Sequence, residues 1–190
     1  MTARASTERK LLDAADALLF TQGVAATPVD RILERAGVSP ATLYRTYGSK
    51  DGLVAAALTR RHEQWLAVWD EAVDRAPDAR AALLAVLDAL DEFHDRPDGA
   101  RWCAFLGTAA ELVDPPEALA AAVREDTDSL RRRLRDLAGP VAGDRGDELD
   151  EALVLVVSGH LAMRLRDGAA ASSGPARAVA EALVDLHTRA

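Results

Sequence analysis

The stretch of sequence best suited to binding chemistry is residues 37–50, GVSPATLYRTYGSK. Tyr44 and Tyr47 stand three residues apart, a spacing that puts their two hydroxyls on one face of a helix. Arg45 and Lys50 add positive charge beside them. Hydroxyl, guanidinium and ammonium groups all donate hydrogen bonds to anionic oxygens, and an arginine can also donate to a guanine edge. These residue types therefore predict binding to a phosphate-bearing partner.

Residues that could make or break covalent bonds are scattered. The four histidines, His62, His94, His160 and His187, lack the paired spacing of metal ligands. There is no glycine-rich phosphate loop, and Cys103, the single cysteine, has no neighbour in the sequence that would activate it. We therefore expect no catalytic residue, no metal and no cofactor. An all-α enzyme whose cysteine and histidine meet only in space stays an alternative.

The elements that must position these residues are helices. Strand alternation is nearly absent, whereas apolar residues recur at helical spacing, as in the stripe over residues 11–19. Thr27-Pro28 and Ser39-Pro40 each place a hydroxyl residue before a proline, the preferred way to start a helix. Gly37 and Gly48 are expected to end helices. The sequence thus predicts an all-α fold of about nine helices, near residues 11–23, 28–36, 40–48, 49–69, 78–94, 101–113, 116–137, 148–166 and 175–188.

Two of these helices, with the turn at Gly37-Val38 between them, have the spacing of a helix-turn-helix motif. In that motif the first residues of the second helix meet base edges in the DNA major groove. Small residues at Pro40, Ala41 and Thr42 would let the backbone come close to the bases, and Leu43 would anchor the helix to the core. By spacing alone, a plain helical corner with solvated charges remains an alternative.

A family resemblance extends without a gap from Thr7 to Leu58. It is carried by LLDAA at 11–15, QG at 22–23, ATPV at 26–29, Ile32, ERAGVS at 34–39, TLYR at 42–45 and SK at 49–50. These residues are similar to the N-terminal DNA-binding domain of the TetR family of transcriptional regulators. The resemblance implies a helix-turn-helix domain of three helices over residues 1–52 and a helical ligand-binding and dimerisation domain over 53–190.

The same resemblance implies roles for individual residues. Phosphate contacts would come from Thr27, Tyr44, Tyr47 and Lys50. The DNA groove would be lined by the start of the recognition helix, with Ser39, Pro40, Ala41, Thr42 and Arg45. One departure concerns Thr46-Tyr47-Gly48, which stands where the family often has His-Phe-Pro. The helix is therefore predicted to end with Gly48 in a left-handed conformation.

Charge is divided unevenly along the chain. The net charge is −8, but residues 1–61 carry nine Lys and Arg against six Asp and Glu, a net of +3, and the remaining residues carry −11. This division suggests an anionic partner for the N-terminal end only. One cysteine excludes an internal disulfide, and no secretory signal or apolar run of membrane-spanning length is present. We therefore expect a cytoplasmic protein without a membrane partner.

The C-terminal part offers a set of candidate ligand contacts. Three tryptophans in a chain with 4% aromatic residues are suggestive, because apolar pockets are commonly lined in this way. The alternative is that these side chains only fill core. The candidates for contact with an unknown small-molecule effector are Trp65, Trp69, Trp102, Cys103, Phe105, His160 and Met163.

The last two predicted helices are the candidates for a homodimer interface. The helix over 153–163 has more apolar surface than one face requires, Gly159 permits close approach, and Val179, Leu183 and Leu186 form a stripe. Completion of the monomer core is the alternative. The resulting hypothesis is a homodimeric, ligand-responsive repressor that binds a palindromic operator. A helical interaction protein with a vestigial DNA-binding motif is a second rival, beside the enzyme.

Overall fold

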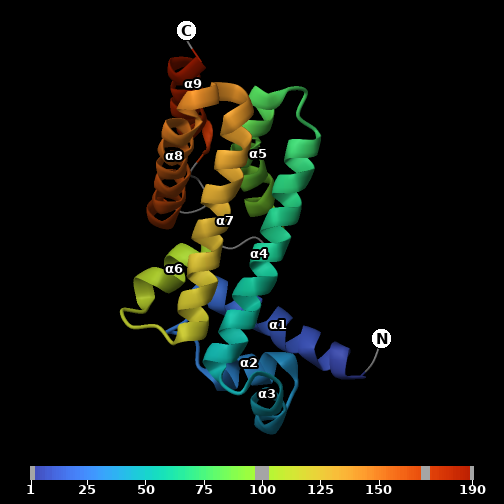
Figure 1. Cartoon of the computed structure of the whole chain (residues 1–190). Coiled ribbons are helices and arrows are strands. Elements are labelled where there is room, and N and C mark those ends of the chain that lie inside the picture. Colours follow the sequence, from blue (N-terminus) through green and yellow to red (C-terminus); the bar gives the residue numbers. More distant parts are fainter. Residues whose placement is uncertain (1–2, 97–102, 168–171, 189–190) are drawn as a thin grey trace. The chain divides into compact units, whose positions relative to one another are not determined.

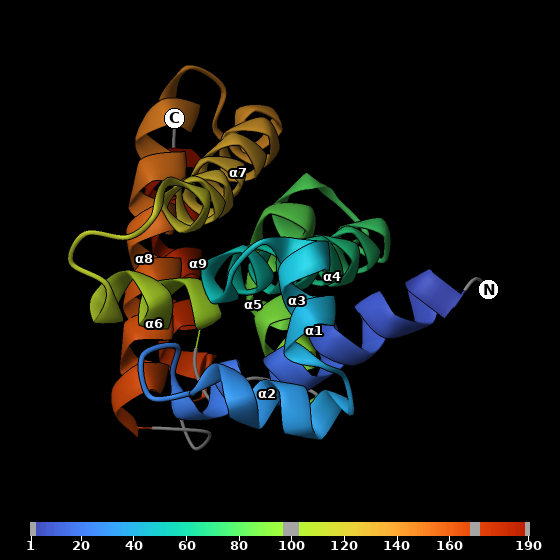
Figure 2. The same ribbon diagram turned by 90° about the horizontal axis from the view of Figure 1, so that it is seen from below.

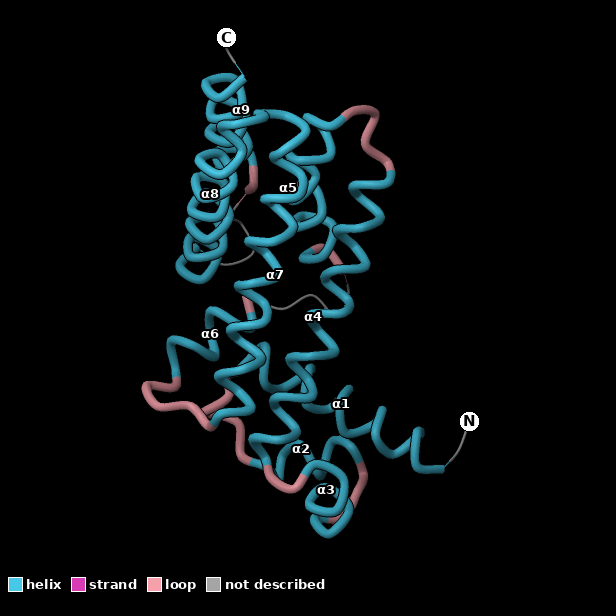
Figure 3. The backbone as a smooth tube through the Cα atoms, viewed as in Figure 1, coloured by secondary structure: helices cyan, strands magenta, loops and turns pink. Residues whose placement is uncertain are grey.

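The computed structural model describes residues 3–96, 103–167 and 172–188. In that part of the chain all regular structure is helical, which confirms the all-α prediction (Figures 1 and 3). The helices are α1 (Ala3–Gln22), α2 (Val29–Ala36), α3 (Pro40–Tyr47), α4 (Lys50–Asp74), α5 (Ala79–His94), α6 (Ala104–Glu111), α7 (Glu117–Ala142), α8 (Gly146–Asp167) and α9 (Gly174–Thr188), with a short 3-10 turn at Gly143–Arg145.

Two compact units make up the fold. Unit 1 comprises Met1–His62 and Ala100–Arg124, and unit 2 comprises Glu63–Gly99 and Glu125–Ala190. The two units are compact groups of residues that pack together. The division predicted between residues 52 and 53 is of another kind, because it separates DNA binding from ligand binding and dimerisation. The functional division therefore stays a prediction.

The core of unit 1 is built from the predicted apolar stripe of α1. Leu11, Ala15, Leu18 and Leu19 are all buried, because helical spacing directs them to one face of α1. Figure 2 shows α1, α2 and α3 of this unit from below. The other large core residues of the unit are Phe20, Ile32, Leu33, Leu43, Leu53, Leu58, Phe105 and Leu119.

The core of unit 2 includes Trp69 of α4, whose side chain is fully buried. Other members of this core come from α5, α7, α8 and α9, and include Leu83, Leu87, Leu134, Leu153 and Val184. Where α8 begins, a Cβ added at Gly146 would stand 3.4 Å from the Cα of Gly139 of α7, an ordinary van der Waals contact.

Three predicted helix boundaries are wrong. α1 begins at Ala3 and not near residue 11, and α4 continues to Asp74, beyond the predicted end at 69. α7, predicted to end at 137, continues to Ala142, and α8 begins at Gly146. Pro140 lies in the last turn of α7 and has no N–H to donate to the carbonyl of Asp136, so the helix continues there without that hydrogen bond. The start of the helix predicted at 101–113 lies outside the described residues, and α6 is observed from Ala104 to Glu111.

Candidate nucleic-acid interface

The turn between α2 and α3 is fixed by glycine geometry. Gly37 adopts the left-handed conformation, with φ 63° and ψ 40°, which a residue with a Cβ adopts at a cost. The N–H of Val38 then donates to the carbonyl of Leu33 at 3.2 Å, which closes the end of α2. Pro40 opens α3 directly afterwards. The helix, turn and helix are therefore where the sequence predicted them.

The hydroxyl caps predicted for these two helices do not form. Ser39 stands at the N-cap of α3, but its side chain makes no cap hydrogen bond and its Oγ lies 3.0 Å from Oγ1 of Thr42 instead. The N-cap of α2 is Pro28, so the prediction of Thr27 at that position is wrong. Thr27 is fully buried and its hydroxyl donates to the carbonyl of Gly23 at 2.7 Å. Because this hydroxyl is engaged within the fold, we leave Thr27 out of the DNA interface proposed below.

The first two turns of α3 leave one face open to solvent. Pro40, Ala41 and Arg45 are exposed, and Tyr44 has 52% of its surface accessible. Leu43 points the other way and is completely buried, so it fixes the helix to the core of unit 1. Thr42 is half-buried at the edge of this face. An exposed face that begins with small residues and carries a phenol and a guanidinium matches the surface the sequence predicted.

The two tyrosines of α3 lie in different environments. Tyr44 is exposed, whereas Tyr47 is half-buried against the core of unit 1, and its hydroxyl lies 3.5 Å from the carbonyl oxygen of Glu8. Burial raises the pKa of the Tyr47 hydroxyl, and the nearby Glu8 carboxylate raises it further. Residues three apart on a helix differ by about 60° in direction, and the edge of the core falls between these two. A phosphate contact from Tyr47 stays a prediction.

Lys50, the first residue of α4, is also partly engaged. Its ammonium donates to the carbonyl of Val24 at 2.7 Å and is half-buried. An ammonium has three N–H donors, so the predicted phosphate contact stays open to the remaining two. Gly48, between Tyr47 and this helix, has the expected positive φ of 75° but a ψ of −36°. The predicted left-handed conformation of Gly48 is therefore wrong, because φ is positive as expected but ψ lies outside the left-handed region.

One residue beside this motif could not be predicted from local sequence patterns. Glu111, the last residue of α6, accepts a hydrogen bond from the backbone N–H of Ala25 at 2.8 Å. The two residues lie 86 positions apart, so no local pattern could pair them. The available signal was weaker: a carboxylate at the C-terminal end of a helix, where the helix dipole disfavours it.

The seven candidate ligand contacts fall into different environments. Trp65 of α4 is half-buried, with its ring 5.5 Å from that of Trp69 and 5.7 Å from that of Phe93. The guanidinium of Arg133 lies 4.8 Å over the ring of Trp69. Trp69 thus fills core in unit 2, and Trp102 lies outside the described residues.

Two of the candidates within the described residues, Cys103 and Phe105, belong to unit 1. Phe105 is buried in its core and meets the ring of His62 edge-on at 6.0 Å. Cys103 is half-buried at the N-cap of α6, where its sulfur accepts the N–H of Leu106 at 3.5 Å. A role of either in ligand binding stays a prediction.

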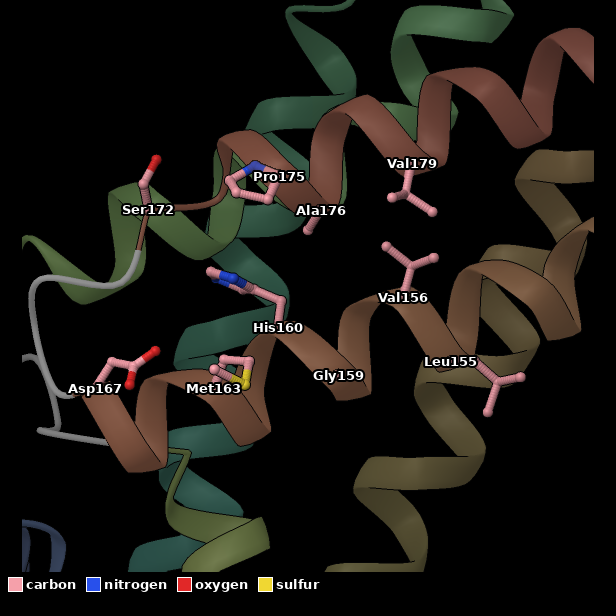
Figure 4. Close-up of a pocket in the computed structure, with 10 residues that line it drawn as sticks. All are labelled: Leu155, Val156, Gly159, His160, Met163, Asp167, Ser172, Pro175, Ala176 and Val179. Atoms are coloured by element: carbon pink, nitrogen blue, oxygen red, sulfur yellow. The ribbon is translucent and has the colours of Figure 1, made fainter.

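His160 and Met163 line a hollow of about 450 Å³ between α8 and α9 (Figure 4). His160 is 6% exposed, and its Nε2 has no hydrogen-bond partner among the described residues. Burial lowers the pKa of this imidazole, and the positive charge of Arg164 lowers it further, which favours the neutral ring. Most of the hollow is apolar, with Val156, Gly159 and Ala176 on its walls.

Comparison with known proteins identifies the family. Residues 11–57 match the family model described as bacterial regulatory proteins, tetR family. The crystal structure of SCO4454, a TetR-family transcriptional regulator from Streptomyces coelicolor, superposes with a TM-score of 0.88 at 25% sequence identity, and the match covers 97% of each chain. The chain belongs to the TetR family.

Two curated HTH-type regulators match over shorter lengths. An uncharacterised HTH-type transcriptional regulator of Bacillus subtilis, YvkB, is 44% identical over 54 residues, which is 28% of this chain and 29% of YvkB. The HTH-type transcriptional activator FasR of Mycolicibacterium smegmatis is 28% identical over 148 residues, which is 78% of this chain and 64% of FasR. This chain therefore matches less than two thirds of the length of either relative.

Family membership favours one class of function. The similar proteins are transcriptional regulators with a DNA-binding fold, which supports a regulator over an enzyme. None of the helices in the described ranges combines the length and the apolar character that crossing a membrane requires.

Proposed function

We propose that this TetR-family protein is a homodimeric, ligand-responsive repressor that binds a palindromic DNA operator through α3. The observation that carries the proposal is the division of α3 into a fully buried anchor, Leu43, and an exposed face that carries Tyr44 and Arg45. The proposed DNA-binding domain spans residues 1–52, and the ligand-binding and dimerisation domain spans 53–190. The proposed duplex partner supports a location in the bacterial cytoplasm.

On the DNA, some exposed residues of α3 would contact bases and others would contact phosphates. Ser39, Pro40 and Ala41 are exposed and short, which lets the start of the helix enter the major groove. Arg45 reaches a guanine edge or a phosphate, and the Tyr44 hydroxyl donates to a phosphate oxygen. Phosphate contacts by Tyr47 and Lys50 would use the parts of these half-buried side chains that the fold leaves available.

The dimer would form through α8 and α9. Large apolar side chains are exposed on both helices: Leu155 at 73% and Met163 on α8, Val179 at 52% and Leu186 on α9. A Cβ added at Gly159 would meet no atom within 4 Å, so a partner helix can approach closely there. Two such helix pairs related by a two-fold axis make a four-helix interface. The two copies of α3 would then read half-sites about one helical turn of DNA apart.

The effector is an unidentified small molecule, and we propose that it binds in unit 2 near Trp65. This ring is half-buried and packs against Trp69 and Phe93, which gives an apolar wall with one accessible aromatic side chain. Ligand binding would shift the population away from the DNA-binding arrangement. The hollow lined by His160 and Met163 lies on the proposed dimer face, so we propose that partner side chains fill it.

Selection of bound duplexes from a random pool tests the proposal. A palindromic sequence should be enriched. The logarithm of the binding constant should fall linearly with the logarithm of salt concentration, with a slope of about −0.9 for each phosphate that the protein neutralises. Failure to enrich any duplex, or an affinity unchanged between about 50 and 200 mM salt, would favour the helical interaction protein instead.

The direction of regulation needs a reporter gene placed behind the selected sequence. A repressor lowers reporter output when the protein is produced, and a small molecule from a panel restores it. The relative FasR is named an activator, so a rise in output would assign this protein to activation. Quenching of tryptophan fluorescence by the same molecule, lost in Trp65→Phe, would locate the effector beside Trp65.

A further inference from the structure

One peptide group in unit 1 is held at both ends by opposite charges. The carbonyl of Val24 accepts a hydrogen bond from the ammonium of Lys50 at 2.7 Å. The N–H of Ala25, on the other side of the same peptide bond, donates to the carboxylate of Glu111 at 2.8 Å. Lys50 is the first residue of α4 and Glu111 the last residue of α6. The turn between α1 and α2 is therefore tied to two helices that are distant from it in sequence.

Both charges stand at helix ends where the helix dipole disfavours them. A lysine in the first turn faces the partial positive charge of unpaired N–H groups, and a glutamate in the last turn faces the partial negative charge of unpaired carbonyls. Neither position favours its own helix. The contacts with the Val24–Ala25 peptide compensate, because a charged hydrogen bond is stronger than a neutral one. The stability of α4 and α6 therefore does not explain why a lysine and a glutamate stand at these two positions.

The turn itself has little freedom to move. Gly23 has a φ of 96°, and a Cβ added there would stand 2.6 Å from Oε1 of Glu111, so the carboxylate packs directly on the glycine. The hydroxyl of Thr27 donates to the carbonyl of Gly23 at 2.7 Å, inside the core. A turn held by these bonds transmits a displacement of Glu111 to the start of α2, two residues beyond Thr27.

We propose that Glu111 is a positioning residue for DNA binding. By holding the N–H of Ala25, α6 sets where α2 begins and hence where α3 presents its exposed face. This inference rests on the proposed DNA-binding function.

The alternative role for Glu111 has an effect of opposite sign. A carboxylate that merely stands near the DNA repels phosphates, and its removal strengthens binding. A positioning carboxylate weakens specific binding when it is removed. Glu117, on the first turn of α7, is the matched control, since it is exposed, belongs to the same unit and carries the same charge.

The experiment measures duplex affinity of the full-length protein and its Glu111→Ala, Glu111→Gln and Glu117→Ala variants, well below the unfolding temperature. The probes are a duplex enriched from a random pool by the wild type and a random-sequence duplex of the same length. Glu111→Ala should bind the enriched duplex on the order of fivefold more weakly. Glu111→Gln, which keeps an acceptor oxygen, should lose less. Glu117→Ala should bind unchanged or more tightly, and all variants should bind the random duplex at least as well as the wild type.

Amide hydrogen exchange gives a second reading that does not depend on DNA. The N–H of Ala25 should exchange faster in Glu111→Ala than in the wild type or Glu117→Ala. If Glu111→Ala fails to fold, Glu111→Gln carries the same comparison. A wild type that binds a duplex, with Glu111 variants that bind it equally or more tightly, overturns the positioning role alone. A wild type that binds no duplex overturns the proposed function and the role of Glu111 with it, whatever the exchange rate of Ala25.

Discussion

Two surfaces of this protein are left uncovered, and they differ in chemistry. The face of α3 carries small residues, a phenol and a guanidinium, whereas the face of α8 and α9 carries Leu155, Val179 and Leu186. The first suits a hydrated, anionic partner, and the second suits an apolar surface like itself. Exposure alone therefore does not define an interface. The chemistry of the exposed side chains determines which kind of partner can displace the water that covers them.

The largest expected effect comes from placing a charge on the apolar face. Leu155→Arg would bury an unpaired guanidinium at the proposed dimer contact, so the dimer dissociation constant should rise on the order of 100-fold. Sedimentation over a range of concentrations measures this constant. Glu125→Arg, on the exposed surface of α7, is the control and should remain dimeric. A Leu155→Arg protein that associates like the wild type would remove α8 from the interface.

The next effect belongs to the face of α3. Arg45→Ala should weaken binding to the selected duplex by about 1–3 kcal/mol, because one base or phosphate contact is lost. The control is Arg132→Ala on α7, which removes the same charge from an arginine paired with Glu125. Fluorescence anisotropy with a labelled duplex measures both. Equal losses in the two variants would mean that total charge, not the face of α3, governs binding.

The third prediction concerns α8 and the dependence of stability on pH. The pKa of His160 is lowered by burial and by Arg164, while Asp91 acts in the opposite direction. The unfolded chain therefore binds a proton more readily than the folded one, and stability is lost as pH falls below the ordinary histidine value of about 6.5. Chemical denaturation at several pH values should show a steeper acid loss for the wild type than for His160→Gln. Parallel curves would exclude His160 as the cause.

The smallest expected effects separate the two tyrosines. Tyr44→Phe should weaken duplex binding by about 0.5–1.5 kcal/mol with no change in stability, because the lost hydroxyl is exposed. Tyr47→Phe should change binding less. Since the pKa of Tyr47 is raised in the folded state, wild-type stability should fall relative to Tyr47→Phe as pH rises above about 10. Thermal unfolding and anisotropy on both variants test this, and identical behaviour would contradict the difference in burial.

Much of the fold follows from local signals in the sequence. The glycine at position 37 and the proline at position 40 act within a few residues, so α2, the turn and α3 are where the sequence predicted them. The stripe of Leu11 and Leu19 is buried as predicted, although α1 begins earlier, at Ala3. The helix-turn-helix region and the exposure of Tyr44 and Arg45 could be read in the same way. Pattern and spacing are sufficient where the deciding contacts are close in the chain.

The features that could not be predicted depend on distant partners. Lys50 bonds to Val24, Tyr47 lies against Glu8, and Ala25 is held by Glu111, at separations of 26, 39 and 86 residues. For the tryptophans, composition could not distinguish pocket from core. In the structure Trp69 is fully buried under Arg133, whereas Trp65 keeps an accessible edge. Whether a tryptophan is buried depends on how the helices pack against one another. The sequence of a single helix does not determine that packing.

The cysteine at the N-cap of α6 has a practical consequence. Cys103 is the single thiol of the 190-residue chain, and it is half-buried at the opposite end of the helix from Glu111. A thiol-reactive fluorophore would therefore attach at one defined point without any engineered cysteine. Its emission would follow α6 in real time as operator or effector is added, in the unmutated protein.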